Sequence, residues 1–290
     1  MEIRTLRAFV EVVRQGGFSR AAKTVFATQS AVSKAIKQLE EEIGVPLLNR
    51  LGHKSKLTAA GEIVYARALR ILAERDALLA ELDELRGVKR GTLRLGLPPV
   101  GASTLFAPLF AAYRSRYPEI DIHLVEHGAE KLEEMLLTGE LDLIASLLPV
   151  SEEFDWQDVR REPLMVLLPD NNPLAERPSL RLIDLKMLPF ILFQTGFALN
   201  RVILDACKRN GFEPLVTAQS GQVDFIEQLV ASGMGIAFLP RMIADQRSQA
   251  LVRAITLAEP GMDYHIAMVW RRGTYIPHAA RAWLQLSKTG

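Results

Sequence analysis

Hydrophobic periodicity divides the chain into two parts, and this change of period restricts the fold more than any other feature of the sequence. Through most of residues 1–86, apolar side chains recur at intervals of three and four, the spacing of amphipathic helices. From Thr92 onward, short apolar runs typical of strands alternate with helical segments. Such alternation indicates an α/β fold with a mostly parallel sheet. We therefore predict a helical N-terminal part followed by an α/β body.

The length and composition indicate a globular protein. A chain of 290 residues is long enough for about two domains. No segment reaches the roughly 20 uninterrupted apolar residues of a membrane span, and charges interrupt residues 1–17, so the chain lacks the apolar centre of a secretory signal. We expect a soluble cytoplasmic protein that contacts no membrane. Cys207 is the only cysteine, which excludes an internal disulfide, and its helical surroundings favour a buried structural residue over a nucleophile.

Charge is distributed unevenly along the chain. Residues 1–60 contain ten Lys and Arg against five Asp and Glu, a net charge of +5. Residues 91–290 contain 19 against 23, a net charge of −4. Because phosphate groups attract a basic surface, only the N-terminal part is expected to contact nucleic acid.

Three short helices are predicted before residue 45. The first covers residues 4–14 and ends at Gly16 and Gly17, and Phe18 and Ser19 then resemble a hydrophobic staple and an N-cap for a second helix through Val25. Thr28 can cap a third helix that runs to about Glu42 and ends at Gly44. The buried face of this third helix is expected to consist of Val32, Ala35, Ile36, Leu39 and Ile43. The second and third helices form a helix-turn-helix.

The other face of the third helix carries hydrogen-bonding and cationic side chains. It consists of Gln29, Ser30, Ser33, Lys34, Lys37 and Glu41. Such groups can bind base edges in a major groove while the lysines neutralise phosphates. The same residue types are common on any solvated helix face, so this helix alone leaves both interpretations open.

A basic hairpin is predicted directly after the third helix. Two short apolar stretches in residues 47–58 flank a turn, and Arg50, Lys54 and Lys56 place cations on it. A basic wing next to a recognition helix supplies phosphate contacts that fix the register on DNA. The wing therefore favours the DNA-binding interpretation.

Three sequence segments of this region resemble those of a known family. LRAFVEVVRQGGFSRAA, TQSAVSKAIKQLEEEIGVPLLNR and LTAAGE stand in the order and spacing of LysR-type transcriptional regulators, which the chain resembles along its whole length. Leu48 and Asn49 depart from that pattern, which usually has Phe and an acidic residue there. The resemblance implies that DNA is contacted by a defined set of residues. With the flanking Thr28 and Lys56 included, this set is Thr28, Gln29, Ser30, Ser33, Lys34, Lys37, Arg50, Lys54 and Lys56.

The resemblance also implies partners. A LysR-type regulator is expected to bind double-stranded promoter DNA and a small-molecule effector, to form a homotetramer from two dimers, to contact RNA polymerase, and to act as a transcriptional activator.

A long helix is predicted over residues 59–86, with Thr58 as its cap. Apolar residues and Arg75 alternate at spacings of four and three, at Val64, Ala68, Ile71, Arg75, Leu78, Leu82 and Leu85. This pattern is typical of a coiled-coil seam, so the helix is expected to form a homodimer that presents two recognition helices to a palindromic site. A helix packed in its own core is the alternative. Gly87 and Gly91 indicate a hinge before the body.

The overall prediction is an all-α winged helix-turn-helix head and a long linker helix, joined to a two-lobed α/β body that is Rossmann-like and, by the resemblance, like a periplasmic binding protein. We assign residues 1–60 to the DNA-binding domain, 61–90 to the dimerisation helix and hinge, and 91–290 to the effector domain. Residues 91–162 and 266–290 are expected to form the first lobe and 163–265 the second.

Ligands of open α/β sheets bind beyond the carboxyl ends of strands. This rule selects four loops, at residues 98–103, 147–150, 194–200 and 220–224. The expected effector-binding residues are Pro99, Val100, Ser103, Leu147, Leu148, Phe193, Gln194, Thr195, Phe197, Gln222 and Phe225. Each of them could equally pack or cap a helix.

Two observations bear on the chemistry of the effector. Helix N-termini near Ser103 and Asn200 favour a carboxylate, and the resemblance is closest to regulators that respond to small carboxylic acids. No arginine lies inside the four loops to clamp a carboxylate, unless Arg201 moves in. We expect a small organic acid.

The candidate enzyme motifs lack the spacing or the residue types that their chemistry requires. His123 and His127 match an inverted zinc-protease pattern, but the alternation around them indicates a strand, in which residues four apart lie about 13 Å from each other, too far to share a metal. Near Gly235, the segment GMGIAF has Phe238 where a dinucleotide fingerprint needs a small residue. We expect no catalytic residues, no metal and no cofactor. A solute-binding protein with an incidental helical head is the rival interpretation.

Overall fold

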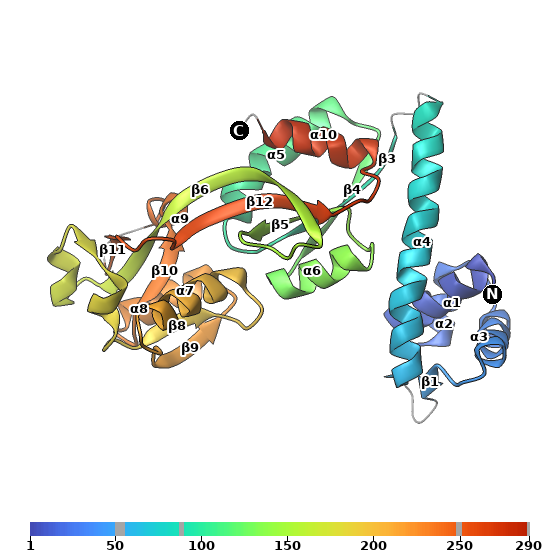
Figure 1. Ribbon diagram of the computed structural model, residues 1–290, viewed down its shortest axis with the longest axis horizontal. Coiled ribbons are helices and arrows are strands. Elements are labelled where there is room, and N and C mark those ends of the chain that lie inside the picture. The colour runs from blue at the N-terminus through green and yellow to red at the C-terminus, as the bar shows by residue number, and fades with distance from the viewer. Residues whose placement is uncertain (50–55, 87–89, 248–250, 289–290) are drawn as a thin grey trace. The chain divides into compact units, whose positions relative to one another are not determined.

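The computed structural model describes the whole chain except residues 50–55, 87–89, 248–250 and 289–290. The chain divides into two compact units (Figure 1). The first comprises residues 1–88 with 137–140, and the second comprises the remainder. We call the winged helix-turn-helix part of the first unit the head and the second unit the body, and each is described by itself.

The head consists of three helices, a small hairpin and the start of a long helix. These are α1 (Ile3–Arg14), α2 (Phe18–Thr24), α3 (Gln29–Ile43), β1 (Leu48–Asn49), β2 (Lys56–Leu57) and α4 (Ala59–Leu85). The antiparallel pairing of β1 with β2 confirms the predicted hairpin. Its turn, with Arg50 and Lys54, lies outside the described residues.

Helix caps in the head follow the sequence signals with one exception. The Thr28 hydroxyl accepts a hydrogen bond from the Ala31 amide (3.2 Å), the Thr58 hydroxyl accepts one from the Gly61 amide (3.0 Å), and Gly44 ends α3 in the left-handed region, all as predicted. The predicted cap at Ser19 is wrong. Helix α2 begins one residue earlier, at Phe18, and its N-cap is Gly17, which has no side chain to bond the first turn.

The core of the head joins all four helices. It contains Leu6, Phe9 and Val10 of α1, Ala21 and Ala22 of α2, Val32, Ile36 and Leu39 of α3, and Ala68, Leu69 and Leu72 of α4. Ile43, predicted to be buried, is exposed in the last turn of α3. Glu40 fixes the chain after α3, since its carboxylate accepts hydrogen bonds from the amides of Leu47 (2.8 Å) and Leu48 (3.2 Å).

Gly61 sits where α4 crosses the segment that follows α3. A methyl group at this position would collide with the carbonyl oxygen of Leu47 and crowd the Leu57 side chain. Because the collision involves backbone, the two segments must move apart, so we expect Gly61→Ala to destabilise the head by about 1–3 kcal/mol. Urea unfolding followed by circular dichroism measures this loss.

Gly17→Ala provides the control for that substitution. Gly17 has extended backbone and open space around its Cα, so an added methyl group meets no other atom there. Because glycine is preferred to alanine at an N-cap, its replacement should still cost about 0.5–1 kcal/mol, less than the collision at Gly61. Equal stability of the Gly61→Ala variant and the wild type would mean that the close approach of α4 to Leu47 is not required.

The first lobe of the body is built on three parallel strands. Strand β3 (Gly91–Leu97) pairs in parallel with β4 (Ile120–Glu126) and β5 (Leu143–Leu147). The connecting helices are α5 (Ala102–Arg116) and α6 (Ala129–Leu137). The C-terminal α10 (His278–Ser287) packs on α5, where Trp283 lies edge-on to Tyr113 and the Tyr113 hydroxyl donates to the carbonyl of Ala279 (2.8 Å).

The second lobe combines a parallel strand pair with strands that pair with β6. Strands β8 (Phe190–Phe193) and β9 (Val216–Ser220) are parallel, and β10 (Ala237–Pro240) and β11 (Val252–Leu257) are antiparallel to β6. The remaining elements are η1 (Pro173–Glu176), β7 (Ser179–Leu180), η2 (Leu182–Leu185), α7 (Ala198–Arg209), α8 (Val223–Ala231) and α9 (Arg241–Ala244).

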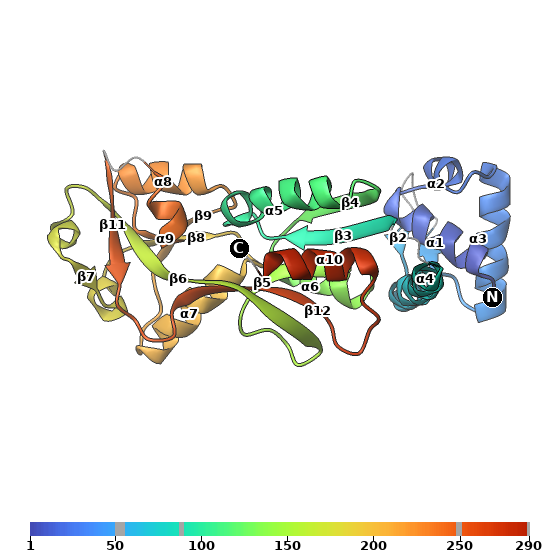
Figure 2. The same ribbon diagram turned by 90° about the horizontal axis from the view of Figure 1, so that it is seen from above.

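Two long antiparallel strands join the lobes, so the prediction of a mostly parallel sheet holds only for β3, β4 and β5 and for the pair of β8 and β9. Strand β6 (Phe154–Pro169) has 16 residues, and its first part pairs with β12 (Asp263–Arg271) in the first lobe. Its second part pairs with β10 and β11 in the second lobe (Figure 2). Within β6, residues 164–169 form a short apolar run of the kind that marks a strand in the sequence, whereas residues 154–162 are mostly polar and are ordered by pairing with a distant segment.

Candidate nucleic-acid interface and ligand cleft

Helix α3 separates its apolar residues from its polar ones. Val32, Ile36 and Leu39 are buried in the head. Gln29, Ser30, Lys34 and Lys37 are exposed, and Ser33 is half-buried. The structure thus places the five predicted reading residues on one helix, with most of their side chains available to a partner.

The polar contacts of this face leave most of its hydrogen-bonding groups at the surface. Lys37 lies 3.6 Å from the Glu41 carboxylate, and both side chains are well exposed. Thr28 shares a hydrogen bond with the Ser30 hydroxyl (3.1 Å) while it caps the helix. Exposed ion pairs of this kind are weak and exchange readily for a phosphate. Lys56 is exposed on β2, and Arg50 and Lys54 lie outside the described residues.

One exposed residue of the helix-turn-helix was not anticipated. Phe26, in the turn between α2 and α3, has a side chain that is 98% exposed and a φ of 53°. Its signal in the sequence is weak, namely an aromatic residue where a helix stop usually has glycine.

The long helix α4 has two halves with different environments. Gly61, Ala68, Leu69 and Leu72 are buried in the head. Of the predicted seam, Ala68 is buried and Val64 packs against the head core, whereas Ile71, Leu78, Leu82 and Leu85 are exposed, with exposed fractions from 39% to 81%. Exposed leucines at spacings of three and four on one helix form a continuous stripe that needs a partner.

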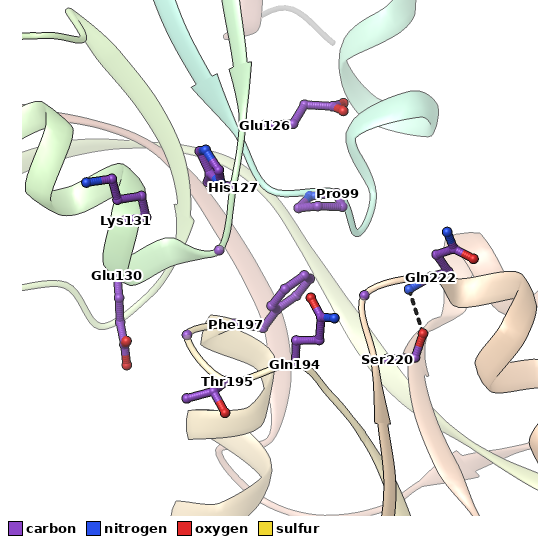
Figure 3. Close-up of a pocket in the computed structure, with 13 residues that line it drawn as sticks. Pro99, Glu126, His127, Glu130, Lys131, Gln194, Thr195, Phe197, Ser220 and Gln222 are labelled. Carbon is purple, nitrogen blue, oxygen red and sulfur yellow. Dashed lines mark hydrogen bonds between the residues drawn. The ribbon is translucent and has the colours of Figure 1, made fainter. Parts of the chain in front are cut away.

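A cleft of about 670 Å³ opens between the lobes of the body (Figure 3). Its lining residues come from the loop after β3, the segment from the end of β4 to the start of α6, the loop before α7 and the turn between β9 and α8. They are Pro99, Glu126, His127, Gly128, Glu130, Lys131, Gln194, Thr195, Gly196, Phe197, Ser220, Gly221 and Gln222. The volume is that of a typical small-molecule site.

Five predicted effector residues line this cleft, and two line a smaller cavity beside it. Pro99, Gln194, Thr195, Phe197 and Gln222 face the main cleft. Val100 and Leu147 line the smaller, mostly apolar cavity with Tyr264, and Phe197 borders both.

The other four predicted effector residues are not among those that line either cavity. Ser103 and Phe225 are exposed, on α5 and α8. Leu148 is half-buried beyond the end of β5, and Phe193 is buried and stacked on Phe197, with ring centroids 5.5 Å apart. Phe193 thus supports the ring that lies at the cleft.

The charged residues of the cleft were missed by the sequence analysis. Glu126, His127, Glu130 and Lys131 come from the turn after β4. The strand-end rule applies to this turn as well, but His123 and His127 were considered there only as a zinc pattern. That pattern lies at a strand, as expected, because His123 is within β4 and His127 follows it. Among the described residues, no cluster of His, Cys, Asp and Glu could hold a metal ion.

Two features hold the cleft walls, namely the side chain of Asn200 and a backbone contact between the lobes. The side chain of Asn200 is buried and clamps the adjacent loop, accepting from the Phe193 amide (3.0 Å) and donating to the carbonyls of Phe193 (2.7 Å) and Gln194 (3.0 Å). Across the cleft, the Glu130 amide donates to the Gly196 carbonyl (3.3 Å), and a methyl group on Gly128 would crowd that oxygen. The lobes therefore meet backbone to backbone at this edge.

Arg201 joins the lobes behind the cleft and does not line it. Its guanidinium donates to the carbonyl of Pro149 (3.0 Å) and more weakly to that of Leu147 (3.4 Å). Burial raises the pKa of the nearby Glu133 carboxyl, and the positive charge of Arg201 opposes that shift. Arg201 is thus occupied by lobe contacts and supplies no clamp for a carboxylate here.

Cys207 is buried on α7, as predicted. Burial raises the pKa of its thiol to about 11, so the reactive thiolate is scarce at neutral pH. No helix in the described part of the chain is long and apolar enough to cross a membrane.

Two family descriptions match the sequence and together cover most of it. "Bacterial regulatory helix-turn-helix protein, lysR family" matches residues 3–62, and "LysR substrate binding domain" matches residues 86–290. The HTH-type transcriptional regulator YwbI of Bacillus subtilis (strain 168) is 36% identical over all of this chain and 96% of its own length.

Solved structures show the same fold. A full-length OxyR variant from Pseudomonas aeruginosa is 25% identical with a TM-score of 0.80, and the match covers 99% of this chain and 95% of that one. Full-length CbnR complexed with its target DNA is 21% identical with a TM-score of 0.67, over 100% and 99% of the two chains.

Proposed function

Because the chain belongs to the LysR family of DNA-binding transcriptional regulators, we propose that two copies of its head read one promoter duplex through α3, under the control of a small organic acid in the cleft of the body. The chain is a regulator with an effector-binding domain and is not an enzyme.

The proposal that the head recognises DNA is supported mainly by the separation of apolar and polar residues on α3. Apolar side chains of this helix are buried, whereas Gln29, Ser30, Lys34 and Lys37 are exposed. A single helix fits the major groove, and these groups suit base edges and phosphates. Ser33, Thr28 and the wing cations Arg50, Lys54 and Lys56 complete the proposed contact set. The complex of CbnR with its target DNA supports the proposal by analogy of fold.

The proposed dimer uses the exposed stripe of α4. Ile71, Leu78, Leu82 and Leu85 of one copy would pack against the same residues of a second copy. A symmetric pair of heads matches a palindromic site and multiplies the contacts of one head. We further propose that two such dimers form a tetramer, and that the complex activates transcription through RNA polymerase.

The proposed effector is a small carboxylate held by polar groups of the cleft. Thr195, Gln194 and Lys131 can donate hydrogen bonds to it, and Phe197 offers an apolar surface. Binding can act on DNA only if the effector has different affinities for two arrangements of the protein. The absence of arginine among the residues that line the described cleft favours small acids over large polyanions.

A thermal-shift screen of small organic acids against the full chain tests the effector proposal, because a ligand of the folded state raises the melting temperature. For the acid that stabilises the wild type, Thr195→Val should weaken affinity about 10- to 100-fold, since a hydrogen bond to a charged group contributes about 1.5–3 kcal/mol. Thr92→Val, at an exposed position on β3, is the control and should leave affinity unchanged. Equal affinities of wild type and Thr195→Val would place the acid elsewhere.

A further inference from the structure

The charged residues that line the cleft carry an excess of negative charge. Glu126 and Glu130 each contribute a carboxylate, and Lys131 is the only Lys or Arg among the lining residues of the described cleft. Lys131 also shares its ammonium with the carboxylate of Glu134 on the same helix, at 2.8 Å. With His127 counted as neutral, the lining therefore offers one partly engaged cation against two carboxylates.

The carboxylate of Glu130 reaches the wall that the second lobe contributes to the cleft. A methyl group on Gly196 would lie 3.4 Å from Glu130 Oε2, and the backbone amide of Glu130 donates to the Gly196 carbonyl (3.3 Å). In Figure 3 this carboxylate extends toward Thr195, the chain neighbour of Gly196, whereas the ammonium of Lys131 points away from it. Glu130 thus places a negative charge beside the loop before α7.

The same loop is suited to the carboxylate of an effector. Thr195 and Gln194 offer side-chain donors, and α7 begins directly after them with Phe197 as its N-cap, a residue with no group to bond the amides of the first turn. The positive end of the helix dipole and these amides favour an anion here. An effector carboxylate at this loop would lie close to the carboxylate of Glu130, and two like charges brought together in a cleft repel each other.

A positive charge on the effector, next to its carboxylate, removes this repulsion. We propose that the effector is an α-amino acid, whose ammonium donates to the carboxylate of Glu130 and whose carboxylate binds the loop of Thr195. Because Glu130 belongs to the first lobe and Thr195 to the second, such a ligand links the lobes and favours the arrangement in which both contacts are made. The proposal rests on the function proposed above, in which a small organic acid occupies this cleft.

The experiment compares matched acids that differ only in the amino group. The standard L-amino acids and the corresponding carboxylic acids, with hydrogen in place of the amino group, are screened against the full chain by thermal shift. Isothermal titration calorimetry then gives the affinity of each compound that stabilises the protein, of its matched partner, and of the amine that lacks the carboxylate. We expect an amino acid to bind at least about 10-fold more tightly than either partner, the difference that one charge-assisted hydrogen bond supplies.

Glu130→Gln keeps the size of the side chain and removes its charge. We expect this variant to bind the amino acid at least about 10-fold more weakly than the wild type does, and to bind the deaminated acid at least as tightly, because the repulsion is gone. Damage to the fold would weaken both ligands together, so opposite responses identify the charge as the cause. Glu119→Gln, which removes a charge at an exposed position just before β4, at the end of that strand remote from the cleft, is the matched control and should keep the wild-type preference.

Four results would overturn the proposal. Deaminated acids that bind the wild type as tightly as amino acids do would leave an organic acid in the cleft without need of an ammonium. Amines that bind as tightly would make the ligand a simple cation. Unchanged affinity of Glu130→Gln for the amino acid would mean that Glu130 does not hold the ammonium. Failure of both series to bind refutes the proposed organic-acid effector as well, and is distinguishable because the deaminated acids then fail along with the amino acids.

Discussion

Replacing Lys34 with Glu is expected to weaken binding of the regulator to its promoter DNA by about 100-fold or more. The exposed ammonium of Lys34 lies on the polar face of α3, where its loss removes a phosphate or base contact and the new carboxylate repels the duplex. The slope of log affinity against log salt should also become shallower by about one, because one fewer counterion is released. A fluorescence anisotropy titration at several salt concentrations measures both changes.

The control for this variant is Lys186→Glu, which makes the same change of charge at an exposed position of the body. It tests whether net charge alone accounts for the loss, and we expect its affinity to stay within about two-fold of wild type. Both variants should unfold as the wild type does, since both sites are exposed. Wild-type affinity in the Lys34 variant would refute the reading role of α3.

Replacing Leu82 with Asp is expected to dissociate the dimer and thereby weaken promoter binding by roughly 100- to 10,000-fold, the usual gain from linking two binding modules. In a symmetric pair both copies use the same stripe, so one substitution buries two carboxylates in the interface. Because Leu82 is 41% exposed within a single chain, the chain itself should remain folded. Sedimentation equilibrium gives the assembly state, and the anisotropy titration gives the affinity.

Ala80→Asp is the control that distinguishes a charge in the seam from the same charge elsewhere on the helix. Residue 80 lies two residues from Leu82 and about 200° from Leu78 around α4, so the same charge is placed away from the stripe. This variant should assemble and bind as the wild type. Dissociation by both variants, or by neither, would show that the exposed leucines do not form the dimer contact.

The parts of the fold that depend on residues close together in the sequence could be predicted. Thr28, Gly44 and Thr58 mark their helix ends because each cap is made within four residues. The first half of β6 could not be predicted in this way. Its residues become a strand by pairing with β12, about a hundred positions away, and the local sequence carries no record of that partner.

The cleft shows the same limit for side chains. The strand-end rule identified Gln194, Thr195 and Gln222, since it depends only on topology. It could not tell Phe193 from Phe197, because their stacking decides which ring faces the cavity. The exposure of Phe26 likewise depends on where α2 ends, and the order of residues alone does not give that end.

The shared strand β6 also limits how the body can respond to a ligand. Pairing changes from β12 to β10 between Pro163 and Leu164 without a break in the strand. Pulling the lobes apart or sliding one past the other would tear ladder hydrogen bonds, whereas flexing or twisting the ribbon at this point preserves them. We expect a bound effector to rotate one lobe against the other about this junction, so that a small angle gives a larger displacement at the far end of each lobe.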